Sequence, residues 1–203
     1  MLQLLLFQFF LVASIHSDTH THTFSYEVLP ESKISISGTS NVSSFKCLTA
    51  DCAQKGSFVV FEKNDSDIIS FYNALFSVKV RSLDCNNSLI NRDLYKILNS
   101  DKYPFIVLQI KEAELISFFP NSVFKYKVKV DMILANNQRE TKGEVLVQKI
   151  DSGVFRVSGV QKIKLTDFNI KPPTAMLGLI VVDDEMTITF NLVLKARKDL
   201  IGN

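Results

Sequence analysis

Few residues in this chain could perform catalysis, and their positions argue against the common kinds of active site. Hydrolytic triads and most acid–base sites use a histidine as the base. All three histidines lie near the amino terminus, at His16, His20 and His22. The sequence also contains no glycine-rich phosphate loop and no zinc-type spacing of cysteine and histidine. We therefore expect no enzymatic activity and no cofactor.

Carboxylates are the remaining candidates for acid–base chemistry. The densest acidic run is Asp183, Asp184 and Glu185, which leads into a strand-like segment. Two neighbouring carboxylates can divide the roles of acid and base. A solvated strand start is the simpler interpretation, and we assign this run no chemistry.

The cysteines indicate an oxidising compartment rather than a metal site. Cys47, Cys52 and Cys85 allow one disulfide and leave one thiol over. A Cys47–Cys52 bond would close a small loop, whereas Cys47–Cys85 would join distant strands and constrain the unfolded chain more. The residues alone leave both pairings open, and no histidine lies beside the cysteines to complete a metal site.

The amino-terminal segment predicts export. Residues 2–13 form an apolar run that is too short to span a bilayer and fits the core of a signal peptide. We predict a signal peptide over residues 1–17 and a single domain over residues 18–203. No other run is long and apolar enough to cross a membrane, so we expect no integral membrane segment. The protein would then be periplasmic or secreted.

Alternation of polar and apolar residues dominates the rest of the chain. Residues 124–132 alternate without a break, and residues 185–194 repeat the pattern. Successive side chains of a strand point to opposite faces, so each segment predicts an antiparallel strand with one buried face. Further strands are predicted over 33–38, 57–63, 76–83, 104–115, 143–149 and 153–165, and residues 26–29 are a further candidate.

One segment has helical rather than strand periodicity. Residues 87–104 carry apolar side chains at helical spacing, with Ser88 or Asn91 as a candidate cap and Pro104 beyond the end. Residues 65–75 are ambiguous between a helix and a loop leading into a strand.

About eight strands with one or two short helices predict an all-β fold, an eight-stranded antiparallel barrel or a sandwich.

Composition limits the partners of such a domain. The chain has 203 residues, a formal net charge of +2, 46% hydrophobic residues and 16 phenylalanines. That near-neutral balance gives no electrostatic footprint for nucleic acid. The interior of an eight-stranded barrel is either filled by side chains or holds one small ligand.

The connector over residues 165–178, LTDFNIKPPTAMLG, predicts one closed end of a barrel. Its two prolines cannot pair in a central strand. We expect Asp167 to cap a turn, Ile170, Met176 and Leu177 to point inward, and Gly178 to turn the chain into the last strand.

The sequence resembles the YceI-like proteins, exported bacterial proteins of lipocalin-like shape, and most closely the versions common in Bacteroidota. The resemblance spans roughly residues 26–195. It is carried by three segments, 36–47, 82–110 and 165–195, and within them by Asn91, Asp93, Pro104 and Ile106.

The resemblance implies an extended eight-stranded barrel that binds a polyisoprenoid or another long-chain lipid in its cavity, as a carrier or storage protein without enzymatic activity. It also favours the Cys47–Cys85 pairing. The residues expected to contact the lipid are the inward faces of three strands: Ile106, Leu108, Phe124, Tyr126, Val128, Val130, Met132, Met186, Ile188, Phe190 and Leu192.

Two further expectations concern polar groups and an alternative role. The hydroxyl of Tyr126 could meet a lipid headgroup, and Arg81 and Arg156 are weaker candidates for the same contact. The alternative is a non-enzymatic exported interaction module with a solid core, in which the outward lysines at 125, 127 and 129 would contact an acidic surface.

Cleavage after residue 17 would create a metal-binding terminus. A chain beginning Asp18-Thr19-His20 offers a free amine, two backbone amides and an imidazole, a square-planar nitrogen set that suits Cu(II) or Ni(II). Mass spectrometry of the mature protein should then find Asp18 as the first residue. Any other mature terminus removes this metal site.

Overall fold

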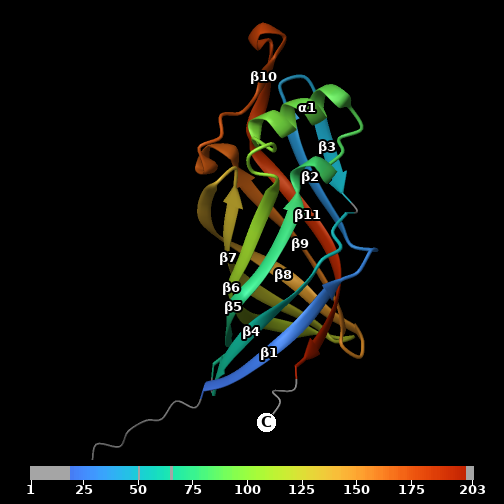
Figure 1. Cartoon of the computed structure of the whole chain (residues 1–203), viewed down its shortest axis with the longest axis vertical. Helices are drawn as coiled ribbons and strands as arrows, with labels where there is room; N and C mark the ends of the chain where they lie inside the picture. The colour runs from blue at the N-terminus through green and yellow to red at the C-terminus, as the bar shows by residue number, and fades with distance from the viewer. Residues whose placement is uncertain (1–18, 50, 65, 200–203) are drawn as a thin grey trace, which may run out of the picture.

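The structure is a computed structural model that describes residues 19–49, 51–64 and 66–199 (Figure 1). The predicted signal peptide and Asp18 lie outside these residues. Thr19 and His20 are the first residues of a strand whose backbone pairs with another strand. Within the described part of the chain, no helix is long and apolar enough to cross a membrane.

Eight antiparallel strands form a closed ring, which confirms the predicted barrel. The order around the ring is β1-β4-β5-β6-β7-β8-β9-β11, and β11 pairs back to β1. The strands are β1 (Thr19–Val28), β4 (Lys55–Lys63), β5 (Ile68–Lys79), β6 (Phe105–Phe119), β7 (Val123–Leu134), β8 (Asn137–Asp151), β9 (Val154–Lys164) and β11 (Ile180–Lys198). The ambiguous residues 65–75 therefore lead into and form part of a strand.

A β-hairpin extends the wall beside the first half of β11. The hairpin consists of β2 (Lys33–Ser40) and β3 (Ser44–Thr49). One edge of β11 pairs with β2 over residues 182–191 and with β1 over residues 194–198. Between the two ladders, Val193 accepts a hydrogen bond from the Leu29 N–H (2.8 Å) and donates its own N–H to the Ser32 hydroxyl (2.9 Å). Ser32 is fully buried, so its side chain supplies the partner that neither strand provides there.

One end of the barrel is covered by helix α1 (Ser88–Ile97), with the 3₁₀ turns η1 (Val80–Ser82) and η2 (Leu165–Phe168) beside it. Asn87 caps α1 through bonds from the N–H groups of Leu89 and Ile90, so neither predicted cap residue was right. The apolar face of α1 packs on a core that includes Leu83 and Phe168, both nearly inaccessible to water. Figure 1 shows α1 at one end and the free ends of β1, β4 and β11 at the other.

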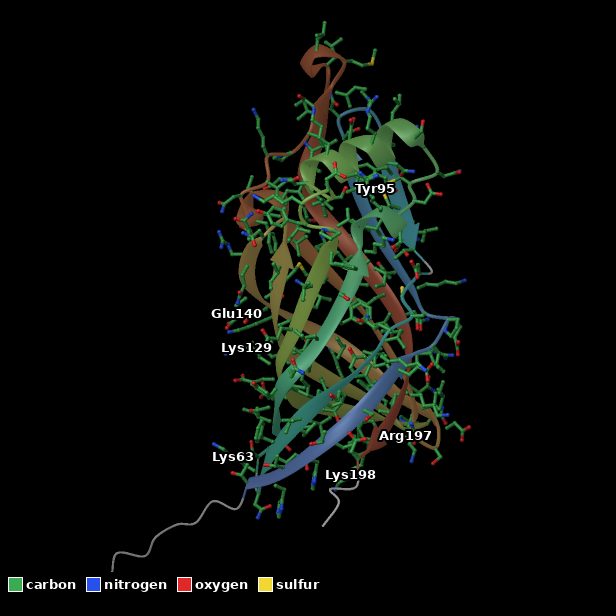
Figure 2. All side chains as sticks on the ribbon, in the orientation of Figure 1. Lys63, Tyr95, Lys129, Glu140, Arg197 and Lys198 are labelled. Carbon is green, nitrogen blue, oxygen red and sulfur yellow. A yellow bond between two sulfur atoms is a disulfide. The ribbon has the colours of Figure 1, made fainter. Side chains whose placement is uncertain are left out.

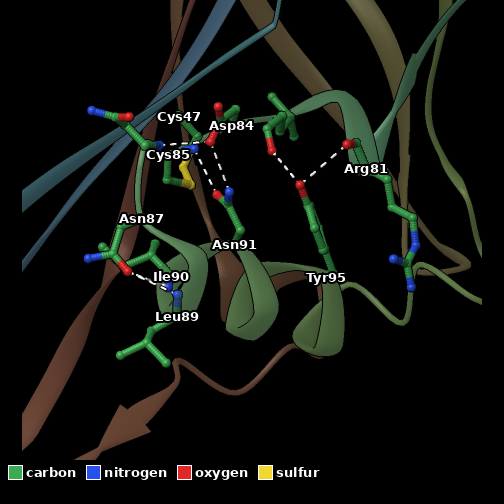
Figure 3. Close-up of a disulfide and its surroundings, with 11 residues drawn as sticks. Cys47, Arg81, Asp84, Cys85, Asn87, Leu89, Ile90, Asn91 and Tyr95 are labelled. Atoms are coloured by element: carbon green, nitrogen blue, oxygen red, sulfur yellow. Dashed lines mark hydrogen bonds between the residues drawn. A yellow bond between two sulfur atoms is a disulfide. The ribbon is translucent and has the colours of Figure 1, made fainter.

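A disulfide between Cys47 and Cys85 joins β3 to the segment before α1, as the resemblance implied (Figure 3). The side-chain carbonyl of Asn91 accepts from the Cys85 N–H, and its amide donates to Asp84, both at 2.8 Å. That bond, followed by one from the Asn86 N–H, holds the pKa of Asp84 below its usual range. The backbone of Asp84 in turn pairs with Leu48 of β3. The disulfide and these hydrogen bonds thus hold the β2–β3 hairpin against the segment that leads into α1.

The connector over residues 165–178 differs in part from its prediction. Ile170 is buried and Gly178 has a positive φ of 91°, as expected. Met176 and Leu177 are strongly exposed instead of inward, because the short strand β10 (Thr174–Ala175) and the turn η3 (Met176–Gly178) project with β11 beyond the barrel (Figure 1). The carboxylate that caps η2 is Asp184 rather than Asp167, since Asp184 accepts from the N–H and hydroxyl of Thr166 at 2.8 and 2.5 Å.

Replacing Ser32 with alanine tests the junction on β11. Ser32→Ala removes the acceptor of the Val193 N–H in a buried site, so we expect a loss of about 1–3 kcal/mol in the free energy of unfolding, measured in urea. Ser37→Ala is the control, because the Ser37 hydroxyl donates only a 3.4 Å bond from β2 to the Thr187 carbonyl of β11. The loss of that bond should cost about 0.5 kcal/mol or less. Equal effects of the two variants would contradict this role for Ser32.

Candidate functional site

The candidate site is the inner face of the barrel. Directly paired residues of antiparallel strands point to the same face, so the register orders the inner residues in rows. Val130 pairs with Ile110, Met132 with Leu108, and Met186 with Ile163. All eleven residues predicted to contact a ligand lie on this inner face.

The interior is divided into a tightly packed part and a part whose side chains remain partly accessible to water. Four of the predicted residues are buried in the core cluster that continues beneath α1: Ile106, Met132, Met186 and Leu192. The other seven are only partly buried: Leu108, Phe124, Tyr126, Val128, Val130, Ile188 and Phe190. Because the strands form a continuous wall around them, the water-accessible surface of these side chains faces the barrel's lumen.

A group of aromatic residues that the sequence analysis did not assign lies on the same inner face. The rings of Phe24 and Phe58 stack at 5.6 Å between centroids, and Phe58 contacts Tyr26 and Phe71, each at 5.9 Å. Gly56 lies beneath Tyr26, where a Cβ would come within 2.7 Å of the ring. The alternation of polar and apolar residues over 24–28 and 57–61 could have indicated these aromatic residues as one face of a strand. Only the strand pairing shows that this face is the inward one.

Glycines on other strands shape the space in the same way. The ring of Phe190 lies over Gly159, where a Cβ would approach the ring to 2.6 Å. Gly38 lies beneath Met186 and Phe45, with hypothetical approaches of 2.7 and 2.8 Å. Missing side chains on one strand therefore make room for large inward side chains on its neighbours.

Two tyrosines bring polar groups to this apolar interior. The Tyr26 hydroxyl donates to the backbone carbonyl of Leu75, whereas the described residues give the Tyr126 hydroxyl no hydrogen-bond partner. Burial raises the pKa of Tyr126, and the nearby Glu62 carboxylate raises it further. Both tyrosines are therefore neutral hydrogen-bond donors at physiological pH.

The other candidates for chemistry have structural roles. Asp183 accepts a 2.5 Å bond from Thr39, and the bonds from Thr166 lower the pKa of Asp184. Cys52 is buried, and burial followed by the charge of Asp51 raises the pKa of its thiol, which makes it a poor nucleophile. Within the described ranges, no group of three or more histidine, cysteine or carboxylate side chains could hold a metal ion.

The two arginines considered for a headgroup lie outside the lumen. Arg81 forms a 2.6 Å ion pair with Asp101 and stacks on Tyr95 beside α1. Arg156 is exposed and alternates with the inward Phe155 and Val157, which places it on the outer face. Neither of these two arginines is therefore placed to contact a ligand inside the barrel.

Two open grooves lie on the outside of the barrel. One, of about 570 Å³, runs along α1 past Arg81, Tyr95 and Asp101. The other, of about 930 Å³, lies between the β2–β3 hairpin and the start of β11. Most of the side chains that line them carry a polar or charged group, and the charges of Arg81 and Asp183 are already occupied. Neither groove is lined mainly by apolar side chains, unlike the inner face of the barrel.

Comparison with known proteins agrees with this geometry. The profile of the YceI-like domain family matches residues 31–194. The structure of a polyisoprenoid binding domain from Saccharophagus degradans, implicated in plant cell wall breakdown, superposes with a TM-score of 0.60 at 10% identity, covering 85% of this chain and 98% of that one.

Two further solved structures are similar at 18% identity. BcnA from Burkholderia cenocepacia has a TM-score of 0.50 and covers 80% of this chain and 96% of its own. A YceI protein from Campylobacter jejuni also has a TM-score of 0.50 and covers 66% and 75%. At these identities the similarity supports the fold. The comparison with curated proteins found no match.

Enlarging one inward residue in each part of the interior tests the division between them. Val128→Phe adds volume where the side chain is only partly buried, so we expect a change of less than about 1 kcal/mol in the free energy of unfolding. Leu134→Phe adds volume where the side chain is buried at 3% exposure, so we expect a loss of about 1–3 kcal/mol. Urea unfolding measures both, and equal destabilisation would mean that the interior is filled throughout.

Proposed function

Because the chain belongs to the YceI-like family, we propose that it binds a polyisoprenoid or a similar long-chain lipid in the lumen of its barrel. The observation that carries this proposal is the partly accessible apolar lining around Val128, Val130 and Phe190. The Saccharophagus degradans structure, whose domain is described as polyisoprenoid binding, supports the same ligand class.

The lining suits a chain-shaped ligand because its affinity can accumulate along the chain. Each methylene group moved out of water contributes roughly 0.8 kcal/mol, which must exceed the cost of ordering a flexible ligand. An apolar interior with few polar groups rewards length rather than a particular functional group. A saturated or isoprenoid tail fits this requirement better than a compact polar metabolite.

The polar end of the lipid would lie near Tyr126. Its hydroxyl is a neutral donor without a partner in the described chain, and the Glu62 carboxylate lies nearby. The tail would extend from there toward the buried core at the α1 end. Contact of the seven partly buried predicted residues with the lipid is part of this proposal, whereas Ile106, Met132, Met186 and Leu192 would support the wall from the core.

We infer that the protein acts as an exported carrier or storage protein rather than as an enzyme. The Cys47–Cys85 disulfide is consistent with an oxidising compartment such as the periplasm or the extracellular space. The assigned acids and the free thiol have structural roles, which supports binding rather than catalysis.

The alternative, an interaction module with a solid core, has less support. Its proposed surface was the outer lysine face of β7, yet Lys125 pairs with Glu144 at 2.6 Å. Lys129 lies between Glu112 and Glu140, at 3.7 and 3.5 Å (Figure 2). Two of the three lysines on this face thus already have carboxylate partners, which weakens its attraction for an acidic surface.

Lipid extraction from the protein isolated from its host, followed by mass spectrometry, tests the proposal. We expect a long-chain lipid in the wild-type protein and at least about tenfold less in Val128→Phe, because the added phenyl ring occupies the lumen. A tenfold loss of affinity corresponds to about 1.4 kcal/mol of binding free energy. Leu146→Phe is the matched control, since Leu146 pairs with Lys125 on the outer face and is exposed.

Equal lipid content in the two variants would contradict binding in the lumen. Recovery of no lipid from the wild-type protein, together with a filled interior, would favour the interaction module instead.

A further inference from the structure

The turn between β6 and β7 carries an uncharged, exposed segment that the proposed function does not explain. We call residues 115–124, LISFFPNSVF, the β6–β7 tip; Glu114 and Lys125 flank it. Phe118 is 76% exposed, and Ile116 and Phe119 are each 47% exposed. Large apolar side chains gathered at a strand end, with no charge among them, indicate a surface that contacts something apolar.

The tip lies at the end of the barrel opposite α1. Strand β6 starts directly after the α1 region, where Val80 bonds to the carbonyl of Pro104, and runs away from it. In the turn that follows β6, the Ser122 carbonyl accepts a hydrogen bond from the Lys149 N–H near the end of β8 (3.1 Å). This bond brings the exposed Ile150 beside the tip.

The apolar surface of the tip continues into the lumen. Phe118 pairs with Phe124, and Leu115 pairs with the inward Tyr126, so Phe118 belongs to the inner row. Phe119 pairs with Val123 on the opposite face. The tip is therefore apolar on both sides, and its inner side leads directly to the lining proposed to hold the lipid.

The backbone of the tip is suited to an apolar environment. The ladder between β6 and β7 reaches Phe119 and Val123, which leaves only a short turn. In that turn Pro120 has no N–H group to satisfy, and the Ser122 carbonyl accepts from Lys149. Unpaired backbone groups are costly in lipid, and the missing N–H of Pro120 and the bond to Ser122 reduce their number in this turn.

The charges around this end suit the polar surface of a bilayer. Lys63, Arg197 and Lys198 lie at the same end (Figure 2), together with Lys149 next to the tip. Carboxylates are also present at this end: Glu62 pairs with His20, Asp151 pairs with Val154, and Asp199 accepts a bond from Ser25. The rim therefore carries both signs. Aromatic residues beside lysines and arginines are typical of segments that rest in the membrane interface.

We propose that the β6–β7 tip inserts into a lipid bilayer and so places the open end of the lumen on the membrane surface. This inference rests on the proposed lipid binding, because a bilayer is where a long-chain lipid resides. A lipid leaving the bilayer along Phe118 and Phe124 would remain in apolar contact until it reached the lumen. A bilayer also needs no shape-matched surface, whereas a stable protein interface buries about 800 Å² on each partner.

A second exposed apolar group supplies the control. Met176, Leu177 and Leu179 are strongly exposed on the projection formed by η3 and the start of β11, at the α1 end (Figure 1). That projection points away from the tip and leads to Asp183 and Asp184 rather than to the lumen. It has at least as much exposed apolar surface as the tip but, in this proposal, no role in docking.

Flotation with phosphatidylcholine vesicles tests the proposal. The double variant Ile116→Asp/Phe119→Asp alters the outer side of the tip, and we expect its ratio of vesicle-bound to free protein to fall at least about tenfold. The control Leu177→Asp/Leu179→Asp should bind vesicles like the wild type. The protein is used as its host makes it, with the terminus read by mass spectrometry, because a retained signal peptide would itself bind vesicles.

Binding of a lipid probe delivered in detergent separates docking from cargo binding. We expect the tip variant to bind the probe normally, since neither substituted residue lies in the inner row. Wild-type protein that binds the probe but no vesicles would overturn docking and leave lipid binding intact. Loss of vesicle binding in the control variant rather than in the tip variant would also overturn membrane docking. So would a difference in sedimentation between the wild type and the tip variant without vesicles, because it would mean that the tip contacts a second copy of the chain.

Discussion

The barrel depends on how one edge of β11 is divided between two partners. A strand that changes neighbours along its length leaves backbone groups without a partner at the junction, and buried groups of that kind are costly. Here the hydroxyl of Ser32 and the N–H of Leu29 satisfy Val193 between the β2 and β1 ladders. With that junction satisfied, β11 can support the β2–β3 hairpin at one end and close the ring with β1 at the other. The hairpin and the closed ring together create two ends with different properties.

The difference between the two ends organises the proposed function. At the α1 end, the disulfide, the helix and the buried core leave little room, and the inward residues there hold the wall in place. Toward the other end, side chains of the same chemical type keep accessible surface, and an aromatic group from β1, β4 and β5 joins the lining. A ligand would therefore be held with its tail against the core and its polar end near Tyr126. The uncharged tip of β6 and β7 extends the same apolar surface to the rim.

The sequence predicted the barrel well because alternation is a strong signal on strands with one wet face. Residues 124–132 and 185–194 show it plainly, and the resemblance to the YceI-like proteins supplied the closure and the disulfide pairing. Alternation could not predict that Val128 is partly accessible while Met132 is buried, since both are inward apolar residues of the same strand. Their burial depends on the side chains that reach them from the other strands of the barrel. The glycines beneath Phe190 and Tyr26 make room for these rings. This effect could not be predicted without knowing which residues are paired across neighbouring strands. Met176 and Leu177 were misassigned because an apolar residue in a connector reads as buried until the length of the projecting hairpin is known.

The Cys47–Cys85 bond also determines where the barrel can move. The two cysteines enclose β4 and β5 in a covalent loop, and the bond lies at the α1 end of that loop. At the opposite end the same strands are held only by hydrogen bonds and by side chains that are partly exposed. Local opening is drawn from regions with few buried contacts, so fluctuations of the wall should concentrate at the rim while the α1 end stays fixed. We therefore expect the α1 end to keep its width and the rim to be the part that adjusts when a ligand enters.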